Sequence, residues 1–324
     1  MDLFSHALLP YLLGNFTKRR KEEIIAFVLG GIAPDIDIFL LLINYLYPTS
    51  FLITHRGITH SLFFGFFAGL TVLYLASRNT VKTRVQRYID FEPVVTFRTV
   101  MFAYAGVIIH LFLDFSTTRG VPFFYPFDAA RYSAEVFFYT DTYLTILSLI
   151  VLIILYKRPV QKHTITKFLA LFLVVFAILG GLRIAEKTSA EKFFQGENLR
   201  AYPTVSIFEW YVIGQDGDRI RIYEYNGFAG TSNYNQTFLR MSVISGGENL
   251  EGALDVAGKL PQVYMFKWRA YAVAINATSS NGVWYIDYYD PLQRAMIRGA
   301  PAAFFMRINA PLRVKVEDGK ATIL

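Results

Sequence analysis

Seven histidine and aspartate residues within the first 114 positions are the groups of this sequence that could do chemistry. They lie in or beside apolar runs, where ionisable side chains are costly and usually mark function. Imidazole nitrogen combined with carboxylate oxygen is the ligand set of zinc, and also of manganese or iron. We therefore predict a site for one or two divalent metal ions, with zinc as the first choice. The candidate ligands are His6, Asp35, Asp37, His55, His60, His110 and Asp114.

The spacing of the histidines limits how they can be presented to an ion. His110 and Asp114 are four positions apart, so they share one face of a helix. His55 and His60 are five positions apart and cannot share a face. One of them must come from a loop and the other from the start of the following helix, where Thr59 and Ser61 are the candidate caps.

Two residues beside these ligands are candidates for direct catalytic roles. Asp37 is the expected general base. Arg56 lies next to His55 in an outer loop, and its guanidinium has the fork geometry that binds phosphoryl oxygens. Two metal ions about 3.5–4 Å apart would activate water and stabilise both oxygens of a displaced phosphate. The same donors could instead line a transport path for a divalent metal ion.

The composition indicates a membrane protein with a soluble part. Of the 324 residues, 54% are hydrophobic and 17% aromatic, and the mean hydropathy is +0.35. The net charge of +7 is expected to lie in cytoplasmic loops, so we expect no nucleic-acid partner. The absence of cysteine excludes disulfides, thiolate zinc sites and cysteine nucleophiles.

Apolar segments that could lie in the membrane fill the first 182 residues. The segment 3–16 is predicted to be a short helix that starts deep in the bilayer. Five further segments are candidate spans, namely 24–47, 61–76, 99–113, 136–156 and 164–182. Within 24–47, Asp35 and Asp37 follow Pro34, where the helix is expected to be broken.

Basic residues alternate between the loops and predict the topology. Thirteen of them belong to loops on one side, which the positive-inside rule assigns to the cytoplasm: 18–21, Arg78, Lys82, Arg84, Arg87, Arg98, Lys157, Arg158, Lys162 and Lys167. The opposite loops hold only Arg56, Arg119 and Arg131. Counted from the basic loops, His6, Asp35 and His110 each lie about 18 Å into the membrane, in its outer half.

After residue 185 the sequence pattern changes to that of a small α+β domain whose strands are mostly antiparallel. Strands are predicted over 208–213, 219–225, 263–275, 283–289, 304–308 and 312–316, with one amphipathic helix over 250–257. The turn Gln215-Asp216-Gly217-Asp218 marks a hairpin. We expect a polytopic helical membrane domain over 1–185 and an extracytoplasmic domain over 186–324, in the inner (cytoplasmic) membrane.

The polar motifs resemble those of the membrane-bound metal-dependent hydrolase family of the YdjM/YbcI type. The matching pieces are His6, Gly31-Ile32-Ala33-Pro34-Asp35-Ile36-Asp37, His55-Arg56-Gly57-Ile58-Thr59-His60-Ser61, and His110-Leu111-Phe112-Leu113-Asp114 continuing to Thr117-Thr118-Arg119-Gly120. That family is distantly similar to zinc phospholipase C and P1-type nucleases, which also use a His-x-x-x-Asp helix. The additional His-x-x-x-Glu ligands of those soluble enzymes are missing from this sequence.

The resemblance implies a hydrolase, whereas the spacing alone indicates only a metal site. The leading interpretation is a membrane-bound metal-dependent hydrolase whose site opens to the outer face. It would cleave a phosphoester in a lipid or lipid-linked substrate. Two alternatives remain: a divalent metal-ion transporter that uses the same donors, and a membrane-anchored binding protein.

Overall fold

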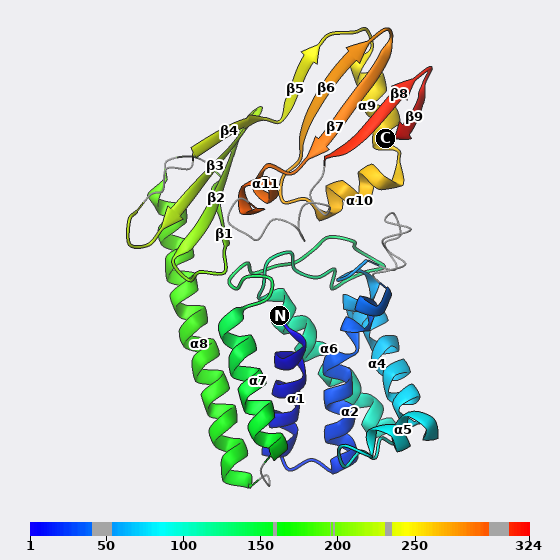
Figure 1. Cartoon of the computed structure of the whole chain (residues 1–324), viewed down its shortest axis with the longest axis vertical. Coiled ribbons are helices and arrows are strands. Elements are labelled where there is room, and N and C mark those ends of the chain that lie inside the picture. The colour runs from blue at the N-terminus through cyan, green and yellow to red at the C-terminus, as the bar shows by residue number, and fades with distance from the viewer. Residues whose placement is uncertain (41–53, 158–160, 195, 197, 231–234, 298–310) are drawn as a thin grey trace. The chain divides into compact units, whose positions relative to one another are not determined.

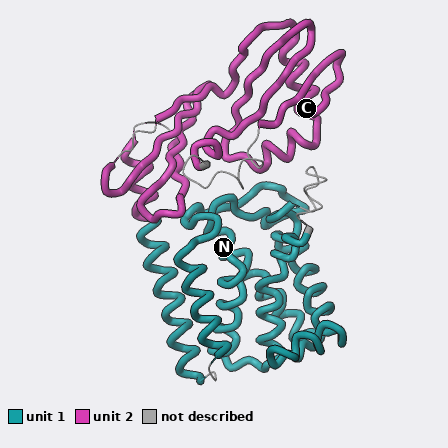
Figure 2. The backbone as a smooth tube through the Cα atoms, in the orientation of Figure 1, with its two compact units in different colours: residues 1–183 teal, residues 184–324 magenta. Residues whose placement is uncertain are grey.

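The computed structural model describes residues 1–40, 54–157, 161–194, 196, 198–230, 235–297 and 311–324. The chain divides into two units, Met1–Arg183 and Ile184–Leu324, which Figure 2 shows in separate colours. The boundary falls inside one long helix, α8 (Lys162–Phe193). Each unit has its own hydrophobic core.

The first unit is a helical bundle, as the apolar segments predict. Its other main helices are α1 (Leu3–Phe16), α2 (Lys21–Ile32), α4 (Leu62–Ser77), α6 (Phe97–Phe115) and α7 (Thr142–Lys157) (Figure 1). Among the described residues, α6 and α8 are long and apolar enough to cross a membrane. The pair formed by α4 and α5 (Asn79–Val85) is a third candidate, although α5 bends away from α4 by 75°. The number of crossings remains a prediction.

Helices α2 and α6 are in direct backbone contact. A Cβ atom added at Gly30 would lie 1.8 Å from the carbonyl oxygen of Ala103. A Cβ atom added at Gly106 would lie 2.2 Å from the carbonyl oxygen of Phe27. Only glycine permits such an approach, which is typical of helices packed in membranes.

Of the predicted spans, 24–47 is broken at Pro34, as expected, and 136–156 begins later than predicted. The segment 24–47 does not form one helix through residue 40, because α2 ends at Ile32 and a 3-10 helix, η1 (Pro34–Leu40), follows. Pro34 lacks the N–H that an α-helix would need there. Residues 41–47 lie outside the described residues. The segment 136–156 is helical only from Thr142, where the carboxylate of Asp141 accepts the N–H of Leu144 at 3.1 Å.

The second unit contains two β-sheets and short helices, which confirms the predicted α+β class rich in antiparallel strands. The four-stranded sheet has the order β1-β2-β3-β4 and the five-stranded sheet has the order β5-β6-β7-β8-β9. All neighbours are antiparallel except β5 and β6. The strands are β1 (Arg200–Pro203), β2 (Glu209–Asp216), β3 (Arg219–Asn226), β4 (Asn235–Leu239), β5 (Met241–Ser245), β6 (Ala274–Ser280), β7 (Val283–Tyr289), β8 (Leu312–Glu317) and β9 (Lys320–Ile323).

The predicted elements of this unit are largely confirmed, with one error. The hairpin joins β2 and β3, and α9 (Leu250–Gly258) covers the predicted helix. The predicted strand over 263–275 is wrong, because α10 (Pro261–Arg269) occupies most of it and β6 begins only at Ala274. Pro261 at the first helical position favours this helix start. The predicted strand over 304–308 lies outside the described residues, and α11 (Pro291–Ile297) was not predicted.

Candidate metal centre

Four helix ends converge on the polar cluster. His6 belongs to the first turn of α1, and Asp35 and Asp37 follow the end of α2. His60 ends the short 3-10 helix η3 (Ile58–His60) just before α4, and His110 lies near the end of α6. Because these helices alternate in direction, the start of α1 and α4 and the end of α2 and α6 lie at one end of the bundle (Figure 1). The basic loops lie at the other end.

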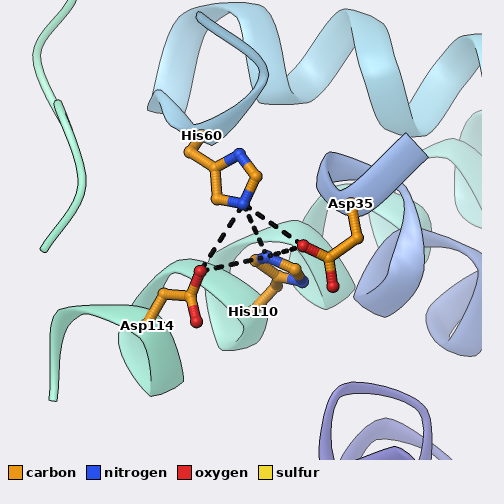
Figure 3. Close-up of side chains that lie close together, drawn as sticks. All are labelled: Asp35, His60, His110 and Asp114. Carbon is orange, nitrogen blue, oxygen red and sulfur yellow. Dashed lines mark hydrogen bonds and ion pairs between the residues drawn. The ribbon is translucent and has the colours of Figure 1, made fainter. Parts of the chain in front are cut away.

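Four donor atoms from three of these regions surround one point (Figure 3). The two histidine Nε2 atoms, of His60 and His110, are 3.2 Å apart. Asp35 Oδ1 lies 3.4 Å from the first and 3.6 Å from the second. Asp114 Oδ2 lies 3.5 Å and 3.6 Å from the same two atoms. All four side chains are buried.

Five of the six donor–donor distances match the edges of a tetrahedral metal site. A tetrahedron with metal–donor bonds of about 2.0–2.2 Å has edges of about 3.3–3.6 Å. The five donor–donor distances given above span 3.2–3.6 Å. The donor set and the spacing therefore fit a zinc-sized divalent cation.

The two imidazoles are oriented by partners on their far sides. The Nδ1 atom of His110 lies 2.7 Å from the carbonyl oxygen of Gly31 and must donate to it. The Nδ1 atom of His60 lies 3.0 Å from the hydroxyl oxygen of Thr59 and 3.3 Å from Asp37 Oδ2. Because the Thr59 hydroxyl donates its own proton to Asp37, its oxygen accepts the proton of His60 Nδ1. Both Nε2 lone pairs then point at the shared centre. Metal-binding histidines use this arrangement of an outer carbonyl or carboxylate.

The charges of the cluster also favour a bound cation. Three buried carboxylates, of Asp35, Asp37 and Asp114, face two cationic groups, the guanidinium of Arg56 and the amino group of Met1. The latter two both contact Asp114 Oδ1. Buried charge of one sign is costly unless it is balanced. The carboxylates outnumber these cationic groups by one, so a bound cation is electrostatically favoured.

Asp37 contacts several residues of the segment 55–60, which carries His55 and His60. Its Oδ1 pairs with Nδ1 of His55 at 2.7 Å. Its Oδ2 accepts the backbone N–H of Arg56 at 3.2 Å and the hydroxyl of Thr59 at 2.8 Å, and faces His60. A carboxylate has about four acceptor positions, so these contacts use its capacity. Asp37, His55 and His60 also form a second group of donors that could hold a metal ion.

Arg56 is buried, contrary to the expectation of a phosphate-binding side chain in an outer loop. It is 1% exposed and has a left-handed backbone, with a φ of 59°. Its Nη2 donates to Asp114 Oδ1 at 2.8 Å. Its Nη1 donates to the hydroxyl of Thr117 at 2.9 Å and to the carbonyl oxygen of Thr118 at 3.0 Å. The guanidinium lies 4.1 Å above the ring centre of Tyr139.

The remaining predicted ligands lie at the edges of the same cluster. His6 is fully buried, and its Nδ1 contacts that of His110 directly. Its Nε2 lies 3.4 Å from Asp114 Oδ1 and, in the described part of the chain, has no hydrogen-bond partner. The side chain of His55 is 21% exposed, which makes it the most accessible of the seven residues. The structure thus brings all seven together.

A loop that the sequence did not predict to be part of the site covers this end of the bundle. We call residues 116–141 the cap loop. Backbone hydrogen bonds hold it, including Thr118 N–H to the carbonyl oxygen of Phe137 at 3.0 Å and Val121 N–H to that of Tyr132 at 3.0 Å. Burial raises the pKa of Tyr139, whose ring lies against the Arg56 guanidinium. The motif Thr117-Thr118-Arg119-Gly120 was the sequence signal for this loop.

Comparison with known proteins gives one match. A family model described as YdjM inner membrane protein matches residues 1–187. The match covers more than half of the chain and contains all seven candidate ligands and the cap loop. No curated protein and no solved structure matches the chain.

Proposed function

Because the chain belongs to the YdjM inner membrane protein family and carries four buried donors at tetrahedral spacing, we propose that it is a metal-dependent membrane hydrolase. Its substrate would be a phosphoester in a lipid or lipid-linked molecule. The observation that supports the proposal most directly is the common focus of His60 Nε2, His110 Nε2, Asp35 Oδ1 and Asp114 Oδ2. A bound divalent metal would supply Lewis-acid polarisation of a phosphoryl oxygen and lower the pKa of water.

The geometry favours one ion, and zinc as its identity. A neutral imidazole has one lone pair, and the proton on His60 Nδ1 faces the Thr59 hydroxyl oxygen and the carboxylate of Asp37. His60 therefore offers Nε2 to one ion, and a second ion beside Asp37 and His55 would require His60 to lose that proton as well. Tetrahedral spacing with nitrogen and oxygen donors is the preference of zinc.

The contacts of Asp37 suggest a positioning role in place of general-base catalysis. Its acceptor positions face His55, Arg56, Thr59 and His60. His55 is better placed to move a proton, because it is partly exposed and its Nδ1 is fixed by Asp37. In this proposal His55 Nε2 takes a proton from water, and Asp37 stabilises the imidazolium that results.

Two features support an enzyme over a metal transporter. A fixed guanidinium, that of Arg56, lies against the ligand Asp114, and a cation in that place would repel a passing divalent ion. Towards the basic loops, α2 and α6 are in backbone contact at Gly30 and Gly106. This packing favours a site that is closed on that side.

We propose that the basic loops face the cytoplasm and that the site and the second unit lie outside it, as the positive-inside rule indicates. The sequence contains no cysteine, so single cysteines can be added without background. An impermeant thiol reagent should label Asp218→Cys, in the β2–β3 turn, in intact cells. It should label Gln86→Cys, beside the basic loops, only after lysis. The reverse pattern would overturn the topology.

Metal content measured together with hydrolysis tests the function. We expect about one zinc ion per purified chain and a substantial loss of zinc in His60→Ala. Release of phosphate or head group from a panel of phospholipids and lipid-linked phosphates should follow the zinc content. Zinc-loaded protein that hydrolyses nothing but passes zinc across proteoliposomes would favour the transporter, and a protein without any metal would remove the site from consideration.

A further inference from the structure

The end of the bundle opposite the metal centre carries a segment whose geometry suits the membrane surface. Helix α5 follows α4 directly but is bent from it by 75°. If α4 crosses the bilayer near its normal, this bend places α5 close to the membrane plane. None of the residues of α5 is buried in the protein. We call residues 78–98, which run from this bend to the start of α6, the basic interfacial segment.

Exposed apolar side chains occur along this segment. Val81 and Val85 lie one turn apart on α5, and a turn follows in which the N–H groups of Tyr88 and Ile89 donate to the carbonyl oxygen of Val85, at 3.0 Å and 3.2 Å. Val85 packs against the hydrophobic core that contains Phe91, and this contact anchors the segment to the bundle. The others are exposed, Tyr88 to 73%, and the exposed apolar residues continue through Val94 and Val95 to Phe97, at 81%.

The cations of the segment differ in their partners. Arg98 pairs with Glu23 at 3.2 Å, and Lys21 of the neighbouring loop contacts Asp90, so these acids tie the segment to α2. Within the described ranges, Lys82, Arg84 and Arg87 form no ion pair. Exposed apolar residues flanked by unpaired cations are the signature of a helix that lies in the interface of an anionic membrane.

We propose that the basic interfacial segment is a binding surface for anionic phospholipid head groups of the leaflet at this end of the bundle. Val81, Tyr88 and Ile89 insert between the lipids, while Lys82, Arg84 and Arg87 contact their phosphates. This surface is separate from the metal centre and does not depend on the proposed hydrolysis. Each basic residue near an anionic surface strengthens such attachment by about five-fold.

Spin labels on the full-length protein test this proposal in reconstituted bilayers. Tyr88→Cys places a nitroxide at an exposed apolar position, and Gln86→Cys places one at an exposed polar position two residues earlier as a matched control. The accessibility of each label to oxygen, which partitions into lipid, is compared with its accessibility to a water-soluble nickel complex. The bilayers contain phosphatidylcholine alone or a mixture with phosphatidylglycerol.

We expect the label at position 88 to be accessible to oxygen and the label at position 86 to the nickel complex. The contrast should grow with phosphatidylglycerol and lose this dependence in Lys82→Gln/Arg84→Gln/Arg87→Gln, whose metal content should stay that of the unsubstituted protein. Equal nickel accessibility at both positions would overturn the proposal. A label at position 88 shielded from both reagents would also overturn it, in favour of a protein partner.

Discussion

The imidazole of His110 donates from Nδ1 to the carbonyl oxygen of Gly31, at a distance of 2.7 Å. This hydrogen bond joins α6 to the last turn of α2 and turns Nε2 of the same ring towards the metal centre. Gly31 is itself pressed against α1, since a Cβ atom there would lie 2.4 Å from the carbonyl oxygen of His6. Gly31 thus fixes the ring orientation of His110 and allows α1, which carries His6, to approach α2 closely.

The substitution Gly31→Ala should therefore damage the site without touching a ligand. The added methyl group has no space beside His6 and Pro10, so α1 and α2 must separate. We expect a loss of about 1–3 kcal/mol of stability and a clear loss of bound metal. Gly181→Ala in α8 is the control, because a Cβ atom there meets nothing within 4 Å. Thermal unfolding and elemental analysis of both variants check this, and equal metal content in the two would contradict it.

The two aspartates that flank Ile36 should respond differently to removal of their charge. Asp35→Asn removes a predicted ligand and should abolish stoichiometric metal binding. Asp37→Asn removes the carboxylate that faces His60 Nδ1 and accepts from the Thr59 hydroxyl, and should weaken binding by about 10–100-fold while leaving the site able to fill at high metal concentration. Titration of the metal-free proteins with zinc distinguishes the two. Identical affinities would mean that Asp37 is a ligand as well.

Arg56 should matter for assembly of the site as much as for any reaction. Arg56→Ala leaves the buried carboxylate of Asp114 without its guanidinium and should cost about 3–5 kcal/mol of stability. Arg56→Lys keeps the charge but cannot reproduce the contacts with Thr117 and Thr118, so an intermediate loss is expected. The exposed Arg84→Lys is the control. The free energy of unfolding of each variant is measured at equal metal loading. An Arg56→Ala variant as stable as the unsubstituted protein would contradict the assigned contacts.

Metal binding should be linked to pH and to folding stability. The ligands must be neutral imidazoles and ionised carboxylates, so protons compete with the metal as the pH falls through about 6.5 and the affinity decreases. Free metal at a hundred times its Kd should stabilise the folded state by about 2.7 kcal/mol, and a strong chelator should remove that stability. Melting curves with and without chelator at pH 8 and pH 5.5 measure this. A melting temperature that changes neither with chelator nor with pH would argue against a resident metal.

Local patterns in the sequence predicted the elements well where one physical rule dominates. The helix over 3–16 and the cap at Ser61 are confirmed, the latter by its acceptance of the Phe64 N–H at 3.1 Å. Counting helical rise placed His6, Asp35 and His110 at one depth, and they do meet, because rise per residue is nearly constant.

The long-range partners could not be predicted from spacing. Arg56 contacts Thr117 and Tyr139, which follow it by 61 and 83 positions, and no periodicity connects residues so far apart. Its adjacency to His55 suggested an outer loop charge, whereas the fold of the cap loop buries it. The contacts of Asp37 with Thr59 and His60 could not be predicted for the same reason, because they depend on how η1 and η3 pack against each other.

The backbone contact between α2 and α6 has a mechanical consequence. Because no side chain separates Gly30 from Ala103 or Gly106 from Phe27, the distance between these helices does not depend on rotamers and cannot be compressed further. Metal–ligand distances tolerate deviations of only about 0.2 Å. If the bundle spans a membrane as we propose, lateral pressure from a thicker or stiffer bilayer would be taken up by tilting of the other helices. The spacing between Asp35, which follows α2, and His110 on α6 would then stay constant, and with it the proposed metal affinity.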